Sequence, residues 1–177
     1  MEILQTGRQT CLRHPVPGDA VAFLEMVRQS RDLHHPWIQP PDDAESFGRY
    51  AEGAAAPRFQ GFLICRRDTG EIAGVANLSE IVRGVFQSAY LGFYASARCA
   101  GQGLMKEGLG LVIRHAFEML GLHRLEANVQ PGNARSLALT RSLGFQKEGF
   151  SPRYLKIAGE WRDHERWALL AEDWRVI

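Results

Sequence analysis

The sequence has few cysteines, no long apolar run and almost no net charge, and each of these limits the kind of protein that it can encode. It has only three cysteines, Cys11, Cys65 and Cys99, an odd number without the spacing of a metal site. No apolar run reaches the roughly 18 residues of a membrane span, and the start at 1–3 lacks the basic and apolar regions of a signal peptide. With 21 basic and 20 acidic residues the formal net charge is +1, too small to attract nucleic acid or membranes. We therefore expect a cytoplasmic protein that binds neither nucleic acid nor membranes directly.

Length and composition favour one folded domain. The chain has 177 residues, of which 45% are hydrophobic, enough for a sizeable core. No internal repeat or low-complexity tract divides it. We predict a single domain over residues 1–177.

A glycine-rich turn at residues 98–103 is the most informative motif. It follows β-forming residues at 90–94 and precedes a helical pattern, which predicts a strand, a tight loop and a helix start. Gly101 and Gly103 remove Cβ atoms that would screen backbone N–H groups at the positive end of that helix. Such a nest fits a pyrophosphate, and each hydrogen bond to the charged group contributes roughly 1.5–3 kcal/mol.

Two other glycine motifs do not fit this turn. A dinucleotide fingerprint beginning at Gly101 needs a third glycine at 106, where the chain has Lys106. A P-loop beginning at Gly103 needs Lys and then Ser or Thr where the chain has Leu109 and Gly110. Neither of these nucleotide-binding motifs is therefore complete.

Strand and helix patterns surround the turn. The predicted strands cover 8–14, 59–67, 71–78, 85–95, 124–130, 145–150 and 161–170. The predicted helices cover 20–27, capped by Asp19, then 42–53, 104–120 and the segment opened by 131–136. Turns at 68–70 and 83–84 make three strands antiparallel neighbours, whereas the helix after residue 103 predicts that strands 85–95 and 124–130 run parallel. The fold class is α/β (α+β), with a mixed, mostly antiparallel sheet and about four helices.

The last predicted helix begins near Asn133. We expect Leu137, Ala138 and Leu143 to face inward and Gly144 to end the helix. Asn133 can be an N-cap or a ligand contact, and a side-chain amide can serve both roles at once.

Several stretches resemble one enzyme family. The pattern Arg-x-x-Gly-x-Gly at 98–103 is similar to the pyrophosphate-binding signature of the GCN5-related N-acetyltransferases (GNAT), and the run 123–150 resembles the second half of that signature. Shorter pieces resemble the RimJ branch, the ribosomal-protein-alanine N-acetyltransferases: IVRG at 81–84, YLGF at 90–93, GQGLM at 101–105 and GEWRDH at 159–164. The likeness is close over about 60–174 and extends to the N-terminal third only in layout.

The resemblance implies a cofactor site. It implies a sheet splayed between the strand ending at Ala95 and the one ending at Gln130, with acetyl-coenzyme A in the wedge. The cofactor-binding residues that it implies are Leu91, Phe93, Arg98, Gly101, Gly103, Leu104 and Asn133. The turn would hold the pyrophosphate, and Asn133 and the strand backbone the pantetheine. An amine would attack the thioester directly, with the carbonyl polarised by a backbone N–H near Phe93.

The usual acid of the family is missing. Many members have a tyrosine in the last helix that protonates the departing thiolate, and the matching residue here is Thr140. The resemblance to the ribosomal branch offers Ser136 instead, because a hydroxyl near a helix N-terminus could assist a thiolate with a pKa of about 8.5. Ser136 could equally be a capping hydroxyl.

The general base stays open. The candidates are Glu80, Glu126, Asn128 acting through water, and the Tyr90 phenol, and each could instead have a surface or core role. An α-amino group has a pKa of about 7.7–8.0, so its neutral form at pH 7 costs about 1 kcal/mol, whereas lysine costs nearer 5 kcal/mol. A site without a strong carboxylate base therefore favours an N-terminal amine, although burial could depress a lysine pKa.

Substrate recognition is expected from aromatic and acidic side chains. The aromatic candidates are Trp37, in the proline-rich loop 34–41 that should expose aromatics, and Tyr154 and Trp161. The acidic candidates are Asp42, Asp43 and Glu45. Trp37 could instead pack the loop, and the acids could be a solvated helix start. No metal is expected, because the pairs 34–35 and 163–164 have no third ligand at suitable spacing.

The sequence thus predicts an acetyl-coenzyme A-dependent N-acetyltransferase, monomeric or homodimeric. Its expected partner is a protein N-terminus, most specifically the alanine of a small-subunit ribosomal protein. One alternative is acetylation of a small amine, such as a polyamine, an amino acid or an aminoglycoside. Another is a non-catalytic acyl-coenzyme A sensor, which the threonine at position 140 permits.

Overall fold

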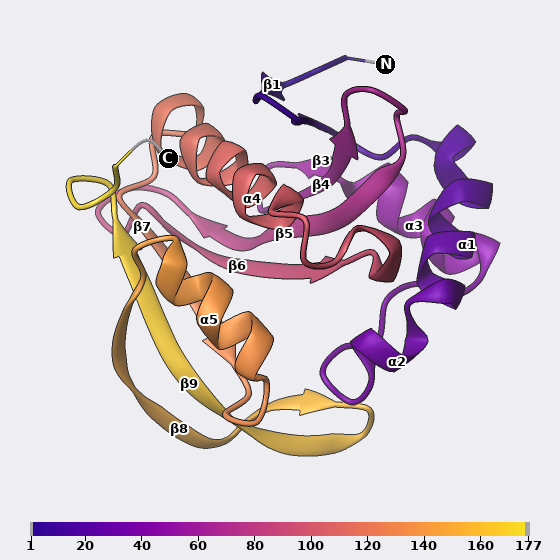
Figure 1. Ribbon diagram of the computed structural model, residues 1–177. Coiled ribbons are helices and arrows are strands. Elements are labelled where there is room, and N and C mark those ends of the chain that lie inside the picture. The colour runs from indigo at the N-terminus through magenta and orange to yellow at the C-terminus, as the bar shows by residue number, and fades with distance from the viewer. Residues whose placement is uncertain (1, 176–177) are drawn as a thin grey trace.

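A mixed sheet forms the centre of the computed structural model, which describes residues 2–175 (Figure 1). Within these residues the sheet has nine strands, in the order β1-β2-β4-β5-β6-β7-β9-β8, with β3 beside β4. The strands are β1 (Gln5–Thr6), β2 (Thr10–Arg13), β3 (Ala55–Ala56), β4 (Phe59–Arg66), β5 (Ile72–Val82), β6 (Ser88–Ala95), β7 (Arg124–Val129), β8 (Gln146–Ile157) and β9 (Glu160–Leu170).

The pairing of β6 with β7 departs from the rest of the sheet. Tight turns make β4, β5 and β6 antiparallel neighbours as predicted, and Gly70 takes the left-handed φ of 75° that such a turn needs. Strands β6 and β7 run parallel, and their register in the described chain extends only from Ser88↔Arg124 to Tyr90↔Glu126. Because β6 continues to Ala95 and β7 to Val129, the two strands diverge beyond Tyr90. The predicted splay of the sheet is confirmed.

Helices cover both faces of this sheet. They are α1 (Ala20–Gln29), α2 (Arg31–His34), α3 (Ala44–Gly53), α4 (Leu104–Arg114) and α5 (Ala134–Ser142). One hydrophobic cluster joins Leu109 of α4 to Leu91 of β6, and a second joins Phe23 of α1 to Val75 of β5. The four expected helices are confirmed, and α2 adds a single turn. Across the described residues, no helix has both the length and the apolarity that a membrane crossing requires.

Some strand boundaries differ from the prediction. Strand β2 is shorter than 8–14, β5 extends beyond residue 78 to Val82, and β8 extends beyond residue 150 to Ile157. Strand β6 begins at Ser88 instead of residue 85, because Gly84 and Gln87 have φ of 71° and 42°, outside the β region. The helix predicted over 104–120 is α4 followed by a π-helical turn over His115–Met119.

Two predicted side-chain placements are corrected. Asp19 does not cap α1, because its carboxylate accepts hydrogen bonds from both terminal nitrogens of Arg13, each at 2.7 Å, and from the N–H of Val16 at 2.9 Å. A buried guanidinium needs a counter-charge more than an exposed helix end needs a cap. Ala138 is exposed, since α5 turns Thr140 and Leu143 toward the sheet.

Candidate active site

The glycine loop joins the end of β6 to the start of α4. After a 3-10 turn at Ala97–Cys99, Gly101 and Gly103 both have a left-handed φ of 77°. A Cβ built at either glycine would meet no atom of the described chain within 4 Å, so backbone conformation and not crowding requires glycine here. The first four N–H groups of a helix have no acceptor within it. The start of α4 therefore has the geometry of an anion site.

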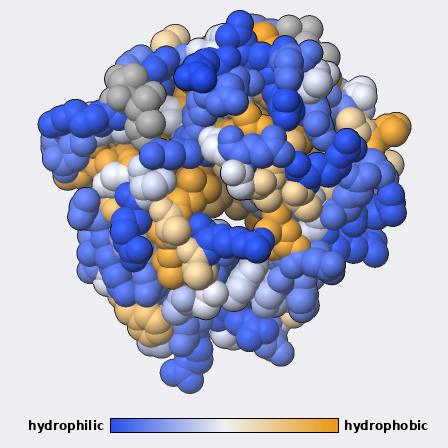
Figure 2. Space-filling view, viewed as in Figure 1, coloured by the Kyte–Doolittle hydropathy of each residue, from blue (hydrophilic) through white to orange (hydrophobic). Residues whose placement is uncertain are grey.

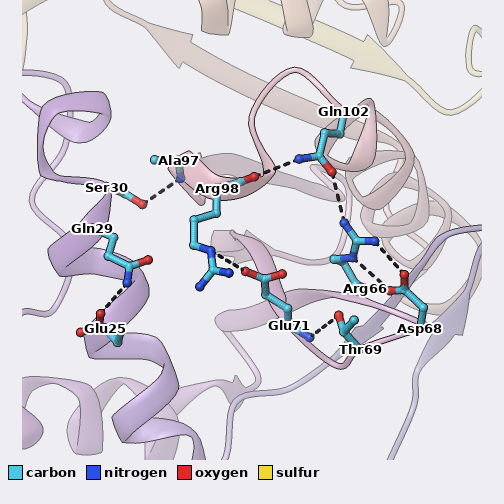
Figure 3. A network of polar contacts seen from close by, with 10 residues as sticks. All are labelled: Glu25, Gln29, Ser30, Arg66, Asp68, Thr69, Glu71, Ala97, Arg98 and Gln102. Carbon is cyan, nitrogen blue, oxygen red and sulfur yellow. Dashed lines mark hydrogen bonds and ion pairs between the residues drawn. The ribbon is translucent and has the colours of Figure 1, made fainter.

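Side chains hold the loop in this shape (Figure 3). The amide of Gln102 donates to the carbonyl of Arg98 at 2.9 Å, and its oxygen accepts from Arg66 at 3.2 Å. Arg66 is fixed in turn by two hydrogen bonds to Asp68. On the other side, the N–H of Ala97 donates to the hydroxyl of Ser30 at 2.9 Å. The loop is anchored from the β4–β5 turn and from the end of α1.

Arg98 is the first residue of the glycine-rich turn at 98–103, and its guanidinium forms an ion pair with Glu71. Its Nε is 3.3 Å from a carboxylate oxygen of Glu71, and its side chain is 67% exposed. Figure 3 shows the guanidinium directed toward Glu71. The role of Arg98 at a pyrophosphate stays a prediction, and the ligand would have to compete with Glu71 for this guanidinium.

Within residues 2–175, the wedge between β6 and β7 leaves one edge of β6 without a strand partner beyond Tyr90. Leu91 and Phe93 pair with β5 on one side, whereas β7 has diverged on the other. The face of the molecule seen in Figure 2 is hollowed near its centre, with both hydrophobic and hydrophilic side chains around the opening. In Figure 1 the same place lies between β6, α5 and α2. An extended ligand could pair with this free edge, as predicted for Leu91 and Phe93.

At the start of α5 the structure shows which of Asn133 and Ser136 caps the helix. The side-chain oxygen of Asn133 accepts a hydrogen bond from the N–H of Ser136 at 3.1 Å, so Asn133 is the N-cap. The hydroxyl of Ser136 is therefore not the cap, and its half-buried side chain remains available for a ligand. Thr140, one turn further, is 0% exposed, and its hydroxyl has no hydrogen-bond partner within residues 2–175.

Tyr90 sits where the sheet opens. It faces Glu126 across the last β6–β7 pair, and it is 36% exposed. The hydroxyl of Tyr154, from β8, lies within hydrogen-bonding reach of the Tyr90 hydroxyl. This hydrogen bond, partial burial and the charges of Glu126 and Glu80 raise the pKa of Tyr90 to about 12. Tyr90 thus stays neutral near pH 7 and is suited to hydrogen bonding more than to removing a proton.

The other candidate bases are largely occupied. Glu126 accepts a hydrogen bond from Nε of Arg124 at 2.9 Å, and Glu80 accepts one from Arg58 at 2.7 Å. In each case an arginine already occupies a carboxylate oxygen that a general base would use. Asn128 follows Glu126 on the same side of β7, and its side-chain oxygen is buried without a hydrogen-bond partner in the described residues. This oxygen is a free acceptor just beyond the point where β6 and β7 separate.

Two predicted aromatic residues line one pocket. A cavity of about 300 Å³ is lined by Trp37, Gln130, Pro131, Gly132, Trp161, Arg162 and Asp163. Trp37 is half-buried instead of exposed, and an atom of its ring would lie 3.1 Å from a Cβ on Gly132. The structure therefore brings Trp37 and Trp161 together at the carboxyl end of β7.

The segment from His34 to Trp37 bridges the two diverging strands. Nε2 of His34 lies 2.8 Å from the carbonyl oxygen of Ala95, at the end of β6. The side-chain amide of Gln130, just past β7, donates to the carbonyl of Trp37 at 3.1 Å. This bridge sets the pocket beside the opening of the wedge.

The predicted acidic cluster does not reach this pocket. Asp43 caps α3 by accepting from the N–H of Ser46 at 2.7 Å, and Glu45 pairs with Arg49 at 2.5 Å. Asp42 lines a different groove, beside α1 and α2. Asp43 and Glu45 are thus bonded to residues of α3 itself. The acidic residue that lines the pocket is Asp163.

Several residues of the site had no strong sequence signal. Gln130 and Asp163 carry polar groups of the pocket, and His34 anchors the bridge, yet none belongs to a recognisable catalytic motif. The available signals were the position of Gln130 directly after a strand whose carboxyl end faces the wedge, and the place of Asp163 in the piece GEWRDH at 159–164. In the part of the chain that the structure describes, no cluster of three or more His, Cys, Asp or Glu could hold a metal ion.

Comparisons with known proteins agree with this geometry. The family model described as Acetyltransferase (GNAT) domain matches residues 9–146. The ribosomal protein uS5-alanine N-acetyltransferase of Escherichia coli K12 is 47% identical over 164 residues, which are 88% of this chain and 84% of that protein. Both the glycine loop and the splayed strands lie within the matched residues.

Solved structures also superimpose on the chain. RimJ of Mycobacterium smegmatis, in complex with CoA-disulfide, has a TM-score of 0.84 and 29% identity, covering 92% of this chain and 82% of that one. The ribosomal-protein-S5-alanine acetyltransferase of Vibrio fischeri has a TM-score of 0.84 and 24% identity, covering 97% and 98%. The latter likeness supports the fold alone.

Proposed function

The chain belongs to the acetyltransferase (GNAT) family, and we propose that it moves the acetyl group of acetyl-coenzyme A to the α-amine of a protein N-terminus. The acceptor proposed is an N-terminal alanine of a small-subunit ribosomal protein, in line with the name of the relative that is 47% identical. Transfer is direct, with both substrates bound together.

The opening between β6 and β7, beside the glycine loop, carries this proposal. The parallel pairing stops at Tyr90↔Glu126, and the loop at the end of β6 presents the N-terminus of α4. One end of the opening therefore suits a phosphate group, and the other leads to the pocket that contains Trp37 and Trp161. A phosphate-bearing acyl carrier and an acceptor amine can meet in such a passage.

The residues present fit acetyl-coenzyme A, which supplies an activated thioester when bound. Backbone amides of Gly101, Gly103 and Leu104, with the guanidinium of Arg98, would hold the pyrophosphate. The free edge of β6 at Leu91 and Phe93, together with the amide protons of Asn133, would hold the pantetheine. These are separate elements of the fold, and their fit supports one extended ligand.

The polar groups near Tyr90 support an α-amine as acceptor. Glu126 and Glu80 are both paired with arginines, and the Tyr90 phenol has a raised pKa, so no strong base is apparent among these candidates. An α-amine needs about 1 kcal/mol to become neutral at pH 7, against about 5 kcal/mol for lysine. The buried oxygen of Asn128 could accept a hydrogen bond from this amine.

Ser136 is proposed to assist the departing thiolate. Its hydroxyl lies at the N-terminal turn of α5, where the helix dipole favours negative charge, and Asn133 already caps the helix. The buried Thr140 hydroxyl is less accessible to a ligand.

A small amine is the rival acceptor, since a cavity of about 300 Å³ would also admit one. The test mixes the protein with acetyl-coenzyme A and, separately, an alanine-first peptide, the same peptide already acetylated at its N-terminus, free lysine, or spermidine, and follows thiol release. We expect release with the unblocked peptide alone. Reaction with spermidine alone would overturn the acceptor, and binding of acetyl-coenzyme A without reaction on any amine would leave a sensor.

A further inference from the structure

Strand β8 loses its regular pairing with β9 at one place. Ser151 pairs with His164 and Leu155 with Arg162, so the three residues between them on β8 face Asp163 alone. Arg153, in the middle of these three, has a left-handed φ of 49°, which a non-glycine residue rarely adopts. Bulges of this kind bend a strand and redirect its side chains.

Asp163 holds the bulge in place. Its carboxylate accepts a hydrogen bond from the N–H of Arg153 at 2.7 Å, which replaces a ladder bond that the bulge removes. A hydrogen bond to a charged acceptor is stronger than the neutral backbone bond it replaces. The left-handed residue is thus fixed by a side chain from the facing strand.

The bulge has a consequence on the far side of the sheet. Strand β8 is three places from β6 in the sheet order, a distance of about 14 Å at the usual strand spacing. Nevertheless the hydroxyl of Tyr154, the residue after Arg153, reaches the hydroxyl of Tyr90. The ring of His164 supports Tyr154 edge-on, with centroids 6.2 Å apart.

We propose that Asp163 is a positioning residue: it fixes the β8 bulge, which places the Tyr154 hydroxyl on Tyr90, and the two phenols together orient the acceptor amine where β6 and β7 separate. The proposal rests on the proposed acetyl transfer. The other titratable groups around the pair are Glu126, Glu80 and His164. The phenols accept or donate hydrogen bonds and remain protonated throughout.

The kinetic test compares D163A, Y154F and the double variant on an alanine-first peptide. Each single variant should lower kcat/KM for the peptide by about 100-fold, the scale of a misplaced substrate group, and leave KM for acetyl-coenzyme A unchanged. The double variant should lose no more than either single one, because both changes disrupt the same contact. D163N keeps an oxygen acceptor for Arg153 and should lose less. E172A, an exposed acid beyond the other end of β9, is the control and should lose nothing.

Asp163 also lines the acceptor pocket, so a spectroscopic readout separates placement from substrate contact. Fluorotyrosine labelling gives ¹⁹F resonances for the four tyrosines, which single Tyr→Phe variants assign. D163A should shift the resonances of Tyr90 and Tyr154 and leave those of Tyr50 and Tyr94 in place, without any substrate present.

Unchanged Tyr90 and Tyr154 resonances in folded D163A would overturn the proposal, as would additive losses in the double variant. If D163A fails to fold, D163N, whose neutral oxygen is a weaker acceptor for Arg153, should shift the resonances of Tyr90 and Tyr154 in part and leave those of Tyr50 and Tyr94 in place; unchanged Tyr90 and Tyr154 resonances there would equally overturn the proposal. If the parent protein acetylates no peptide, the proposed function fails, and the role of the tyrosine pair at an amine fails with it. The resonances would still decide separately whether Asp163 places Tyr154.

Discussion

Replacing Gly103 by alanine should lower the free energy of unfolding by about 1–2 kcal/mol, the cost of a left-handed conformation for a residue with a Cβ. Gly103 has φ of 77° and is the N-cap of α4, directly before Leu104. A Cβ there would meet no described atom within 4 Å, so the whole cost is conformational. If the loop turns to relieve it, the amides at the start of α4 lose their arrangement and KM for acetyl-coenzyme A should rise.

Two glycines within α4 provide matched controls. Gly110 has no neighbour within 4 Å in the described structure and a helical backbone, so Gly110→Ala should raise stability by about 0.5–1 kcal/mol. At Gly108 a Cβ would lie 2.3 Å from Ile64, and overpacking should cost about 1–3 kcal/mol. The same substitution therefore has opposite signs at two positions of one helix, because the added Cβ meets no atom at Gly110 and meets Ile64 at Gly108.

Urea unfolding and initial-rate kinetics test this series together. For a chain of 177 residues, 1 kcal/mol corresponds to about 2–4 °C in Tm, which is measurable. A Gly103→Ala variant with parental stability and parental KM would refute the requirement for a left-handed loop. Destabilisation by Gly110→Ala would show that α4 tolerates no change, and the Gly103 result would then say nothing specific about the loop.

Three further predictions concern single side chains. Asp19→Asn should lower the free energy of unfolding by about 3–5 kcal/mol in urea titrations, because it leaves the buried Arg13 without its counter-charge. Burial opposes ionisation of Asp19, but hydrogen bonds from Arg13 hold its pKa below the usual value. The parent should therefore keep the stability that the ion pair contributes above about pH 4, and lose it as the pH falls through the lowered pKa. The variant has no carboxyl group at this position and should not show that loss. Gly132→Ala presses on Trp37, so it should raise KM for the peptide by roughly fivefold, about 1 kcal/mol, at constant KM for acetyl-coenzyme A in initial-rate assays. Ser136→Ala should lower kcat by about 100-fold in steady-state assays while leaving Tm unchanged, and unchanged turnover would remove this hydroxyl from the mechanism.

The parallel pair and the glycine loop could be predicted because their signals are local. A strand, a left-handed glycine turn and an amphipathic helix follow one another between 88 and 114, and a helical crossover places the next strand parallel to the first. Asn133 as N-cap follows from the same kind of rule, applied over three residues. The paired state of Glu126 was also accessible, since Arg124 lies two residues away on the same face of β7.

Local rules fail where a distant partner competes. The capping rule assigned Asp19 to α1, but Arg13 on β2 is a buried cation and takes the carboxylate. The apolar pattern over 104–120 continues smoothly through the π-helical turn at His115–Met119, so periodicity alone could not reveal where α4 ends. Glu80 meets Arg58 only because of the register between β4 and β5, which the sequence does not state.

The tyrosine pair shows why the acceptor side of the site was harder to predict than the cofactor side. Tyr90 and Tyr154 are 64 positions apart, and each stands in an ordinary strand sequence. Their meeting depends on extra residues in β8, on a left-handed Arg153 and on one hydrogen bond from β9. The alternation of side chains along a sequence predicts which residues share a face of one strand. A bulge, in contrast, changes which residues lie opposite each other in two paired strands. The raised pKa of Tyr90 follows from that meeting, and it keeps the phenol protonated, as a hydrogen-bonding group needs.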